Sequence, residues 1–352
     1  MDSIPFPRIN ALKGPILITG HTGFKGAWLT LLLEFLGLSV VGISHEAENN
    51  SLFSKMNRRG KIVEIFEDLQ NYQKIENFVK EHEPSIVFHL AAQSIVSESY
   101  RDPVRTFSTN VMGTASILDA SCKINSVQTI LVATTDKVYE NNDLGRKFTE
   151  SDPLGGKDPY SASKVGTEMV VKAWRSVQSE RGKPKILVAR AGNVIGGGDY
   201  AQNRIFPDLV RAITANQPLE IRNPFSTRPW QHVLDPIFGY LKFVESSLGG
   251  LKTDSLNFGP DGDEVTVAQL LNIAKGILPI ESLMEKEVKE IFKEAKYLSL
   301  DSSRAKKELT WSPKYSQVEA IQATAKWWAS YLAGEANALS LCRKEIEQFL
   351  EK

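Results

Sequence analysis

The chain has 352 residues, enough for one large α/β core and a smaller second unit. Its 42 basic and 42 acidic residues cancel, so neither nucleic acid nor an anionic membrane is expected as a partner. No apolar run approaches the roughly 20 residues of a membrane span, and the first residues lack a signal-peptide pattern. The two cysteines lie far apart and the five histidines show no ligand spacing. We therefore expect a cytoplasmic protein with reduced thiols and no metal site.

Strand-like and helix-like segments alternate through the first half of the chain. Apolar residues at helical spacing predict helices, among them one over about 72–83 and a long one over about 103–122. Strands alternating with helices of this length predict right-handed βαβ units and a Rossmann-type, doubly wound parallel sheet. The predicted strands cover, in chain order, residues 15–19, 39–43, 61–66, 85–90, 128–133 and 185–190.

From Gly196 the character of the sequence changes. Three consecutive glycines, residues 196–198, predict a hinge, and mostly helical sequence follows to the end of the chain. We place a domain boundary near residue 195, with the sheet in residues 1–195 and a smaller, mostly helical domain in residues 196–352. Some later segments are expected to return to the first domain.

Three glycines follow the first predicted strand and open the first long helix. In this context Gly20 permits the turn, Gly23 lets backbone amides approach a pyrophosphate, and Gly26 lets the helix pack on the strand. The pattern predicts a dinucleotide-binding site. The alternative is a tight strand–helix turn with no ligand.

A dinucleotide site of this kind needs an acidic residue near the end of the second strand to bind the adenine ribose. Glu46 is the candidate, two or three residues later than usual. No arginine sits beside it in the sequence to receive a 2′-phosphate, which favours NAD over NADP. Further candidate cofactor contacts lie in the glycine turn and near the ends of the strands: Thr22, Phe24, Lys25, Asp68, Leu69, Leu90, Ala91, Ala92, Asn110 and Thr134.

Two later stretches carry the candidate catalytic groups. Asp158 and Pro159 predict a helix start, which places Tyr160 and Lys164 one turn apart on one helix face. A neighbouring ammonium favours the phenolate, so the two side chains can form a proton-transfer pair. Residues 134–137 are expected on the loop that leaves the fifth strand, where α/β sheets bind ligands. A tyrosine and a lysine at this spacing more often lie on a solvent-exposed helix face with no catalytic role. The glycine turn earlier in the sequence favours the catalytic interpretation here.

These motifs together resemble the extended short-chain dehydrogenase/reductase superfamily. Within that superfamily, the sequence resembles the CDP-glucose 4,6-dehydratase family over nearly the whole chain. The matching segments are residues 20–26 (GHTGFKG), 135–139 (TDKVY), 152–156 (DPLGG), 190–199 (RAGNVIGGGD), 221–224 (IRNP) and 228–233 (RPWQHV).

The resemblance implies an intramolecular redox dehydration of CDP-glucose with tightly bound NAD as cofactor. The hexose is oxidised at C4, loses water across C5 and C6, and is reduced at C6 to a 4-keto-6-deoxy sugar. Tyr160, supported by Lys164, would be the base toward the C4 hydroxyl, to which Thr135 would hydrogen-bond. Asp136 would be the acid for the C6 hydroxyl and Lys137 the base for the C5 hydrogen, or the two roles could be exchanged.

The resemblance also implies the substrate contacts and the partners. Asn193 and Arg228 match positions at the substrate diphosphate, Arg204 is a second candidate cation, and residues 196–352 would bind the nucleotide sugar. The cytidine preference comes from the resemblance alone. By the same analogy the helices around 103–122 and 160–180 form a subunit interface, so a homodimer or homotetramer is expected. The product would supply deoxysugar for a surface polysaccharide such as lipopolysaccharide O-antigen.

Two other classes of protein stay open. A dehydratase, epimerase or 4-reductase acting on a different NDP-hexose would keep the glycine turn, Thr135, Tyr160 and Lys164. An epimerase or a reductase would have no use for the charges at Asp136 and Lys137, which could then be an ordinary surface pair. A non-enzymatic dinucleotide sensor on the same fold would commonly lose the tyrosine–lysine pair.

Overall fold

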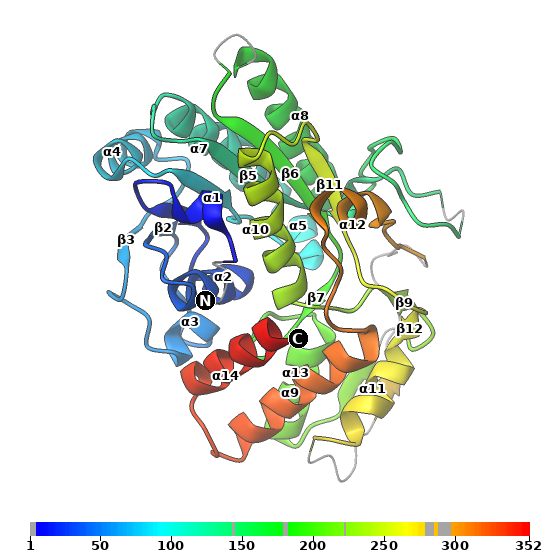
Figure 1. Ribbon diagram of the computed structural model, residues 1–352. Coiled ribbons are helices and arrows are strands. Elements are labelled where there is room, and N and C mark those ends of the chain that lie inside the picture. Colours follow the sequence, from blue (N-terminus) through cyan, green and yellow to red (C-terminus); the bar gives the residue numbers. More distant parts are fainter. Residues whose placement is uncertain (1–4, 143–144, 179–181, 222, 279–284, 288–296) are drawn as a thin grey trace.

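A computed structural model describes residues 5–142, 145–178, 182–221, 223–278, 285–287 and 297–352 (Figure 1). At its centre lies a seven-stranded parallel sheet with the strand order β11-β6-β5-β4-β1-β2-β3. Because the chain winds outward from β1 in one direction and from β4 in the other, a crevice for ligands is expected at the carboxyl ends of β1 and β4. The strands are β1 (Ile16–Thr19), β2 (Val40–Ser44), β3 (Val63–Phe66), β4 (Ile86–His89), β5 (Thr129–Thr135), β6 (Lys185–Ala191) and β11 (Ser255–Phe258).

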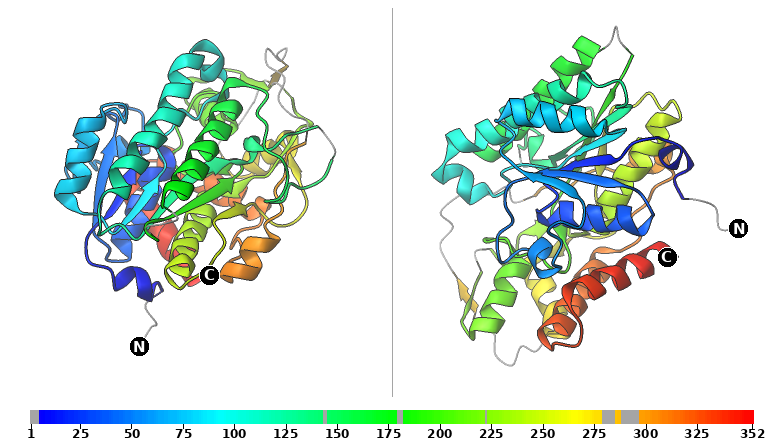
Figure 2. Two further views of the ribbon diagram at one scale, coloured as in Figure 1. Left: turned by 90° about the horizontal axis from the view of Figure 1, so that it is seen from above. Right: turned by 90° about the vertical axis from the view of Figure 1, so that its left-hand side faces the viewer.

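Helices cover both faces of the sheet because its strands are apolar on both sides (Figures 1 and 2). In β5, Ile130 and Val132 pack under one helix layer, while Leu131 and Ala133 pack under the other. One layer contains α2 (Phe24–Phe35) and α10 (Leu234–Leu248). The opposite layer contains α4 (Tyr72–His82), α5 (Val96–Arg101), α6 (Pro103–Phe107), α7 (Gly113–Cys122) and α8 (Pro159–Gln178).

A smaller unit follows the carboxyl end of β6. Three two-stranded pairs connect its segments: β7 (Val194–Ile195) with β10 (Gln231–His232), β8 (Leu219–Ile221) with β13 (Glu285–Glu287), and β9 (Thr227–Arg228) with β12 (Val265–Thr266). Its helices are α9 (Ile205–Ala215), α11 (Val267–Lys275), α12 (Ser303–Leu309), α13 (Gln317–Leu332) and α14 (Ala338–Glu351). Capping boxes at Thr266 and Ser316 fix where α11 and α13 begin.

The predicted Rossmann-type parallel sheet is confirmed, and all six predicted strands are present. Two local predictions differ from the structure. Thr134 and Thr135 do not lie on a loop, because they pair with Arg190 and Ala191 and so extend β5. The long helix over 103–122 is interrupted by a π-helical turn at Ser108–Met112, between α6 and α7. The short helices α1 (Pro7–Asn10) and α3 (Leu52–Lys55) carry no strong pattern and were not expected.

Nothing in the structure fixes the domain boundary near residue 195, which stays a prediction. β11 lies far beyond that position in the chain and pairs with β6 over the register Ser255↔Val188 to Phe258↔Ala191. Within the described ranges, no helix is both long enough and apolar enough to cross a membrane.

Candidate active site

The glycine turn after β1 is shaped by two different constraints. A Cβ on Gly20 would lie 2.8 Å from the backbone of Ala91, and one on Gly26 would lie 2.0 Å from the Gly20 carbonyl oxygen. Packing within the protein therefore requires both glycines. A Cβ on Gly23 would have the Gly20 carbonyl oxygen as its nearest neighbour, at 3.3 Å, so internal packing restricts this position less. Gly23 is the N-cap of α2, where a glycine leaves backbone amides open to a phosphate group.

Lys25, in the first turn of α2, faces the candidate catalytic groups. Its Nζ lies 3.4 Å from the hydroxyl oxygen of the buried Tyr240. The pKa of Lys25 is lowered to about 7, chiefly by burial and then by the cations Arg204 and Lys164, while Asp136 opposes them. The sequence had suggested only a cofactor contact for Lys25, whereas in the structure its amine also interacts with the charges of Lys164 and Asp136.

At the expected adenine-ribose end, Glu46 lies just beyond β2 and forms an exposed two-point ion pair with Arg59. The two N–O distances are 2.7 and 3.0 Å, and the Arg59 guanidinium lies over the Phe66 ring. The sequence argument that no arginine is available here was wrong, because Arg59 comes from the segment before β3. Asp68, another candidate, has its Oδ2 3.7 Å from Nε2 of His45.

The remaining cofactor candidates line the turn and the segment after β4. The Thr22 and Ser44 hydroxyls are 2.6 Å apart, the backbone amide of Ala91 donates to the Thr19 hydroxyl, and Leu69 is buried against Gly113. Phe24 is half-buried and packs against the main core, as does Leu90. The residues Ala91 and Ala92 are half-buried in the same segment.

Asn110 holds that segment in place from the π-helical turn. Its Oδ1 accepts from the Gln93 amide at 2.8 Å, and its Nδ2 donates to the Gln93 carbonyl oxygen and to the Ser163 hydroxyl. The buried amide of Asn110 thus connects the segment after β4 with α8, which carries Tyr160 and Lys164. This places Asn110 as a support of the crevice wall.

The structure brings the candidate catalytic residues together. Tyr160 and Thr135 are both buried, Thr135 lowers the pKa of the Tyr160 phenol, and the Thr135 hydroxyl donates to Oδ1 of Asp136 at 3.0 Å. Asp136 and Lys137 begin a 3-10 turn, and the Lys137 Nζ lies 3.8 Å from the same Asp136 oxygen. Asp136 is only 1% exposed, and its second oxygen, Oδ2, has no hydrogen-bond partner among the described residues.

The charges around Tyr160 differ from the simple picture of a tyrosine activated by Lys164. Burial raises the pKa of Tyr160, Lys137 and the Thr135 hydroxyl lower it, the Asp136 charge raises it, and Arg204 lowers it. Lys164 is buried, donates to the Ala133 carbonyl oxygen at 3.2 Å, and has its pKa lowered by burial to about 8. Lys137 is therefore the cation with the largest effect on the Tyr160 phenol in this structure.

The three candidate substrate residues lie on segments that follow β6. Arg204 is held by Asp199 at 3.2 Å and by the Ser94 hydroxyl at 3.4 Å, and its charge acts on both Tyr160 and Lys25. Asn193 lies between β6 and β7, and Arg228 lies in β9 with its Nη1 donating to the Thr227 carbonyl oxygen. Asp158 caps α8 as predicted, since its Oδ1 accepts from the Ser161 amide at 2.9 Å.

Sequence reasoning missed three residues of the site. Arg59 beside Glu46 and Tyr240 beside Lys25 come from distant segments, so no local spacing could have indicated them. Gly192 contacts Asp136, because a Cβ on this glycine would lie 3.0 Å from Asp136 Oδ2. Gly192 itself lies in the recognised segment 190–199, and that segment was the available signal. Among the described residues, no cluster of three or more acidic, histidine or cysteine side chains could hold a metal ion.

Comparison with known proteins agrees with this arrangement. The model of the GDP-mannose 4,6 dehydratase family matches residues 17–324. A CDP-glucose 4,6-dehydratase from Salmonella typhimurium is 36% identical over 95% of this chain and 96% of its own, and a dTDP-glucose 4,6-dehydratase from Haemophilus influenzae is 26% identical over 89% and 97%.

Solved structures share the fold. A dTDP-glucose 4,6-dehydratase from Streptomyces venezuelae, solved with NAD, has a TM-score of 0.78 at 22% identity and covers 92% of this chain and 99% of its own. A UDP-glucose 4-epimerase from Thermotoga maritima, solved with UDP-glucose, has a TM-score of 0.77 at 23% identity and covers 90% and 99%. The relative from Salmonella typhimurium confirms the predicted resemblance to CDP-glucose 4,6-dehydratases, and the chain belongs to the GDP-mannose 4,6 dehydratase family.

Proposed function

We propose that this protein is a NAD-dependent 4,6-dehydratase that converts CDP-glucose to CDP-4-keto-6-deoxyglucose. The observation that carries this proposal is the buried Asp136 carboxylate, whose Oδ2 has no partner among the described residues and which lies beside Lys137, Thr135 and Tyr160. A site that only oxidises or epimerises at C4 needs one proton-transfer group. A second acid–base pair within reach of the first is what elimination across C5 and C6 requires.

The residues present fit NAD as the cofactor. Gly23 at the start of α2 leaves room for a pyrophosphate, and Glu46 can accept hydrogen bonds from the adenine ribose hydroxyls. Lys164 is expected near the nicotinamide end, beside Tyr160. When bound, NAD supplies a hydride acceptor for C4 and returns the hydride at C6.

The side chains of the chain itself carry the proton transfers. Tyr160 takes the proton of the C4 hydroxyl, and Thr135 hydrogen-bonds the same oxygen. Lys137 then takes the hydrogen from C5, which the C4 carbonyl has made acidic, and Asp136 donates a proton to the C6 oxygen as water leaves. Positive charge on Lys137 favours the Tyr160 phenolate. To act as the base, Lys137 must first release that proton to solvent, to which its side chain is partly exposed, and it becomes positively charged again when it takes the C5 hydrogen.

The cationic side chains Arg204 and Arg228, with Asn193, are proposed to bind the substrate diphosphate, since a planar guanidinium suits phosphate oxygens. The 36% identical relative from Salmonella typhimurium, named a CDP-glucose 4,6-dehydratase, supports the choice of CDP-glucose. We further propose a cytoplasmic location and a role in supplying deoxysugar for lipopolysaccharide O-antigen, both taken from the family resemblance.

A homodimer, alone or within a homotetramer, is proposed through the helix layer of α6, α7 and α8. Methionines on this layer are exposed, with Met112 at 57% and Met169 at 46%, and α8 packs against both α7 and the π-helical turn that carries Met112. Large apolar side chains gathered on two packed helices are typical of a subunit contact.

The experiment that tests the proposed function is product analysis by mass spectrometry. The purified protein is incubated, without added reductant, with CDP-, dTDP-, UDP- and GDP-hexoses in separate reactions. Loss of one water from CDP-glucose alone is the expected result. Water loss from another nucleotide sugar would overturn the cytidine assignment, and isomerisation or NADPH-dependent reduction without water loss would overturn the dehydratase assignment.

A further inference from the structure

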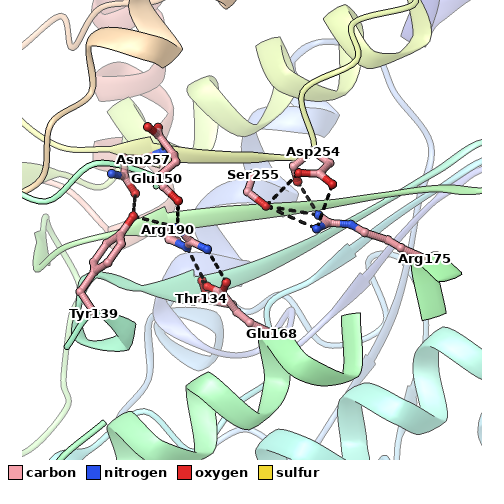
Figure 3. Close-up of polar contacts among 9 residues, drawn as sticks. All are labelled: Thr134, Tyr139, Glu150, Glu168, Arg175, Arg190, Asp254, Ser255 and Asn257. Carbon is pink, nitrogen blue, oxygen red and sulfur yellow. Dashed lines mark hydrogen bonds and ion pairs between the residues drawn. The ribbon is translucent and has the colours of Figure 1, made fainter. Parts of the chain in front are cut away.

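A buried ion pair contacts Thr134 and Tyr139, the two residues that flank the candidate catalytic turn (Figure 3). Arg190, in β6, and Glu168, in α8, are both buried and form two hydrogen bonds, from Nε to Oε1 at 2.8 Å and from Nη2 to Oε2 at 2.6 Å. Neither side chain touches the groups assigned above to substrate chemistry, and the charge of Glu168 opposes the lowering of the Lys164 pKa by burial. The proposed mechanism gives the ion pair itself no step.

The pair reaches the chain on both sides of the catalytic turn. Glu168 Oε1 accepts a hydrogen bond from the Thr134 hydroxyl at 2.9 Å, and Thr134 is two residues before Asp136. Arg190 Nη1 donates to the Tyr139 hydroxyl at 2.8 Å, and Tyr139 is two residues after Lys137. The Asn257 side chain in β11 accepts from the same Tyr139 hydroxyl at 2.6 Å (Figure 3). The segment between Thr134 and Tyr139 is thus tied to the sheet at both ends.

The catalytic groups within this segment are not held equally well. Thr135 belongs to β5 and pairs with Ala191, the last position of the β5–β6 ladder. Asp136 and Lys137 lie beyond the ladder, in a 3-10 turn. That turn is held by a 3.3 Å bond from the Lys137 amide to Thr135 Oγ1 and by a bond from the Gly155 amide to the Val138 carbonyl oxygen. The position of Asp136 and Lys137 therefore depends on how the far end, at Tyr139, is anchored.

We propose that Glu168, Arg190 and Tyr139 form a clamp that positions Asp136 and Lys137 for the elimination step. This inference rests on the proposed function. The clamp residues are positioning residues, since they act through the turn and do not touch the substrate. The clamp supports elimination more than oxidation, because the sheet ladder already holds Thr135 and α8 already holds Tyr160.

The energetics of buried ion pairs indicate that Arg190 and Glu168 position other residues and add little to stability. Replacing such a pair by apolar side chains is often neutral or stabilising, because desolvation offsets the attraction between the charges. The guanidinium of Arg190, however, offers several donors in a fixed plane, and here they contact Glu168 and Tyr139 at once. A lysine has a single ammonium and could not span both contacts.

Tyr139→Phe is the first test, because it removes the hydroxyl and keeps the ring that stacks on Phe148. The enzyme–NAD complex is mixed with CDP-glucose in a single turnover, and the absorbance of reduced nicotinamide and the uptake of solvent deuterium at C5 are followed. We expect reduced nicotinamide to form at about the wild-type rate. Its decay and the C5 exchange should slow on the order of tenfold, since small misplacements of catalytic groups have large rate effects.

Two further variants make the test specific. Tyr72→Phe is the matched control, because its hydroxyl also joins a charged cluster, with Glu76 on α4, Asp119 on α7 and Lys123 just after α7. It should leave both phases unchanged. Arg190→Lys keeps the positive charge but cannot contact Glu168 and Tyr139 at the same time. It should therefore also slow the decay of reduced nicotinamide and the C5 exchange without slowing oxidation, and it serves as the test if Tyr139→Phe does not fold.

The outcomes separate the clamp from the proposed function. Equal slowing of oxidation and elimination, or no slowing of either, in both Tyr139→Phe and Arg190→Lys would overturn the clamp. If the wild-type protein dehydrates CDP-glucose, that result leaves the proposed function intact. If the wild-type protein neither reduces its bound NAD nor releases water with CDP-glucose, the proposed function itself fails, and the clamp has no elimination step to serve.

Discussion

Asp136 and Lys137 are neighbours in the chain with different surroundings. Asp136 is almost completely buried, whereas 20% of the Lys137 side chain remains exposed beside it. A base must lose and regain a proton during each turnover, and the partly solvated amine can exchange with water more readily than the enclosed carboxyl group. This supports Lys137 as the base for C5 and Asp136 as the acid for the C6 oxygen.

Lys137→Met should separate the two chemical steps. The variant retains Tyr160 and Thr135, so slow reduction of bound NAD by CDP-glucose should persist, while exchange of the C5 hydrogen with solvent should stop. Stopped-flow absorbance and mass spectrometry in deuterated water measure the two events. Tyr160→Phe is the control, because it should abolish NAD reduction altogether. Retained C5 exchange in Lys137→Met would assign the base role to another residue.

The lowered pKa of Lys164 predicts a pH dependence. The pKa falls from the ordinary 10.5 to about 8, so the Lys164 ammonium, which the family resemblance assigns to support Tyr160 in addition to Lys137, is lost as the pH rises through about 8. The rate of NAD reduction by CDP-glucose should decline above that pH. Stability should change in the opposite direction: between about pH 8 and 10.5 the unfolded chain keeps a proton that the folded chain lacks, so unfolding becomes less favourable as pH rises. Thermal unfolding measured across pH 7–11 checks the rise in stability, and the rate of NAD reduction over the same range checks the fall in rate. A rate that does not change with pH would mean that the charge of Lys164 has no part in the mechanism.

At the scale of single residues, the sequence predicted the site well where the chemistry is local. Tyr160 and Lys164 are one turn apart on α8, and Thr135, Asp136 and Lys137 are consecutive, so their proximity followed from spacing. The contacts of Arg59 and Tyr240 could not be predicted, since these residues reach the site from segments far away in the chain. The effect of the Lys137 charge on the Tyr160 phenol, the largest of any cation, also escaped prediction, because it depends on how the turn after β5 folds back.

At the scale of elements, the glycine turn before α2 makes separate predictions for two glycines. Gly26→Ala should prevent normal folding, because the new Cβ would overlap the Gly20 carbonyl oxygen. Gly23→Ala should fold with a melting temperature close to that of the wild type, since its nearest neighbour would be 3.3 Å away, yet bind NAD at least about tenfold more weakly. Thermal unfolding and calorimetric titration with NAD measure the two effects. Unchanged NAD affinity in Gly23→Ala would place the pyrophosphate elsewhere.

The first turn of α10 carries a buried acid at a cost to stability. Asp235 is fully buried, its Oδ1 accepts from the Lys314 amide at 2.6 Å, and its Oδ2 has no partner among the described residues. Burial raises the pKa of Asp235 from 3.8 to about 6. The resulting loss of folding stability is therefore absent below pH 3.8, where the carboxyl group is protonated in both states, and complete above about pH 6, where it is ionised in both.

Asp235→Asn keeps the acceptor for Lys314 and removes the charge. The variant should be more stable than the wild type by about 2 kcal/mol at pH 7.5, and the difference should vanish near pH 4. Denaturant unfolding at the two pH values gives the comparison. A gain that persists unchanged at pH 4 would mean that the ionisation of Asp235 is not its cause.

Helices and strands could be predicted from the first half of the sequence because hydrophobic periodicity there is strong and unbroken. The extension of β5 through Thr134 and Thr135 could not, since it depends on pairing with β6. The π-helical turn at Ser108–Met112 could not be predicted either, because it depends on tertiary contacts. It carries Asn110, whose side chain is hydrogen-bonded to both Gln93 and Ser163.

At the scale of the whole molecule, the exposed methionines on the α7–α8 layer make the proposed dimer testable. A Met112→Glu, Met169→Glu double variant should be monomeric in light scattering after gel filtration, because it buries charge in the contact. Phe225→Glu is the control: Phe225 is 83% exposed but lies on neither helix, so its substitution should leave the assembly intact. A double variant that assembles like the wild type would place the subunit interface on another surface.

The position of β11 has a consequence for how the protein is made. This strand completes the edge of the central sheet by pairing with β6, yet it is encoded after several of the segments that build the smaller unit. In a chain emerging from the ribosome, the edge of β6 that faces away from β5 therefore stays unpaired until residues 255–258 arrive. Premature termination or a proteolytic nick ahead of β11 would leave that edge open to strands of other molecules, so incomplete chains should aggregate and not persist as a free N-terminal domain.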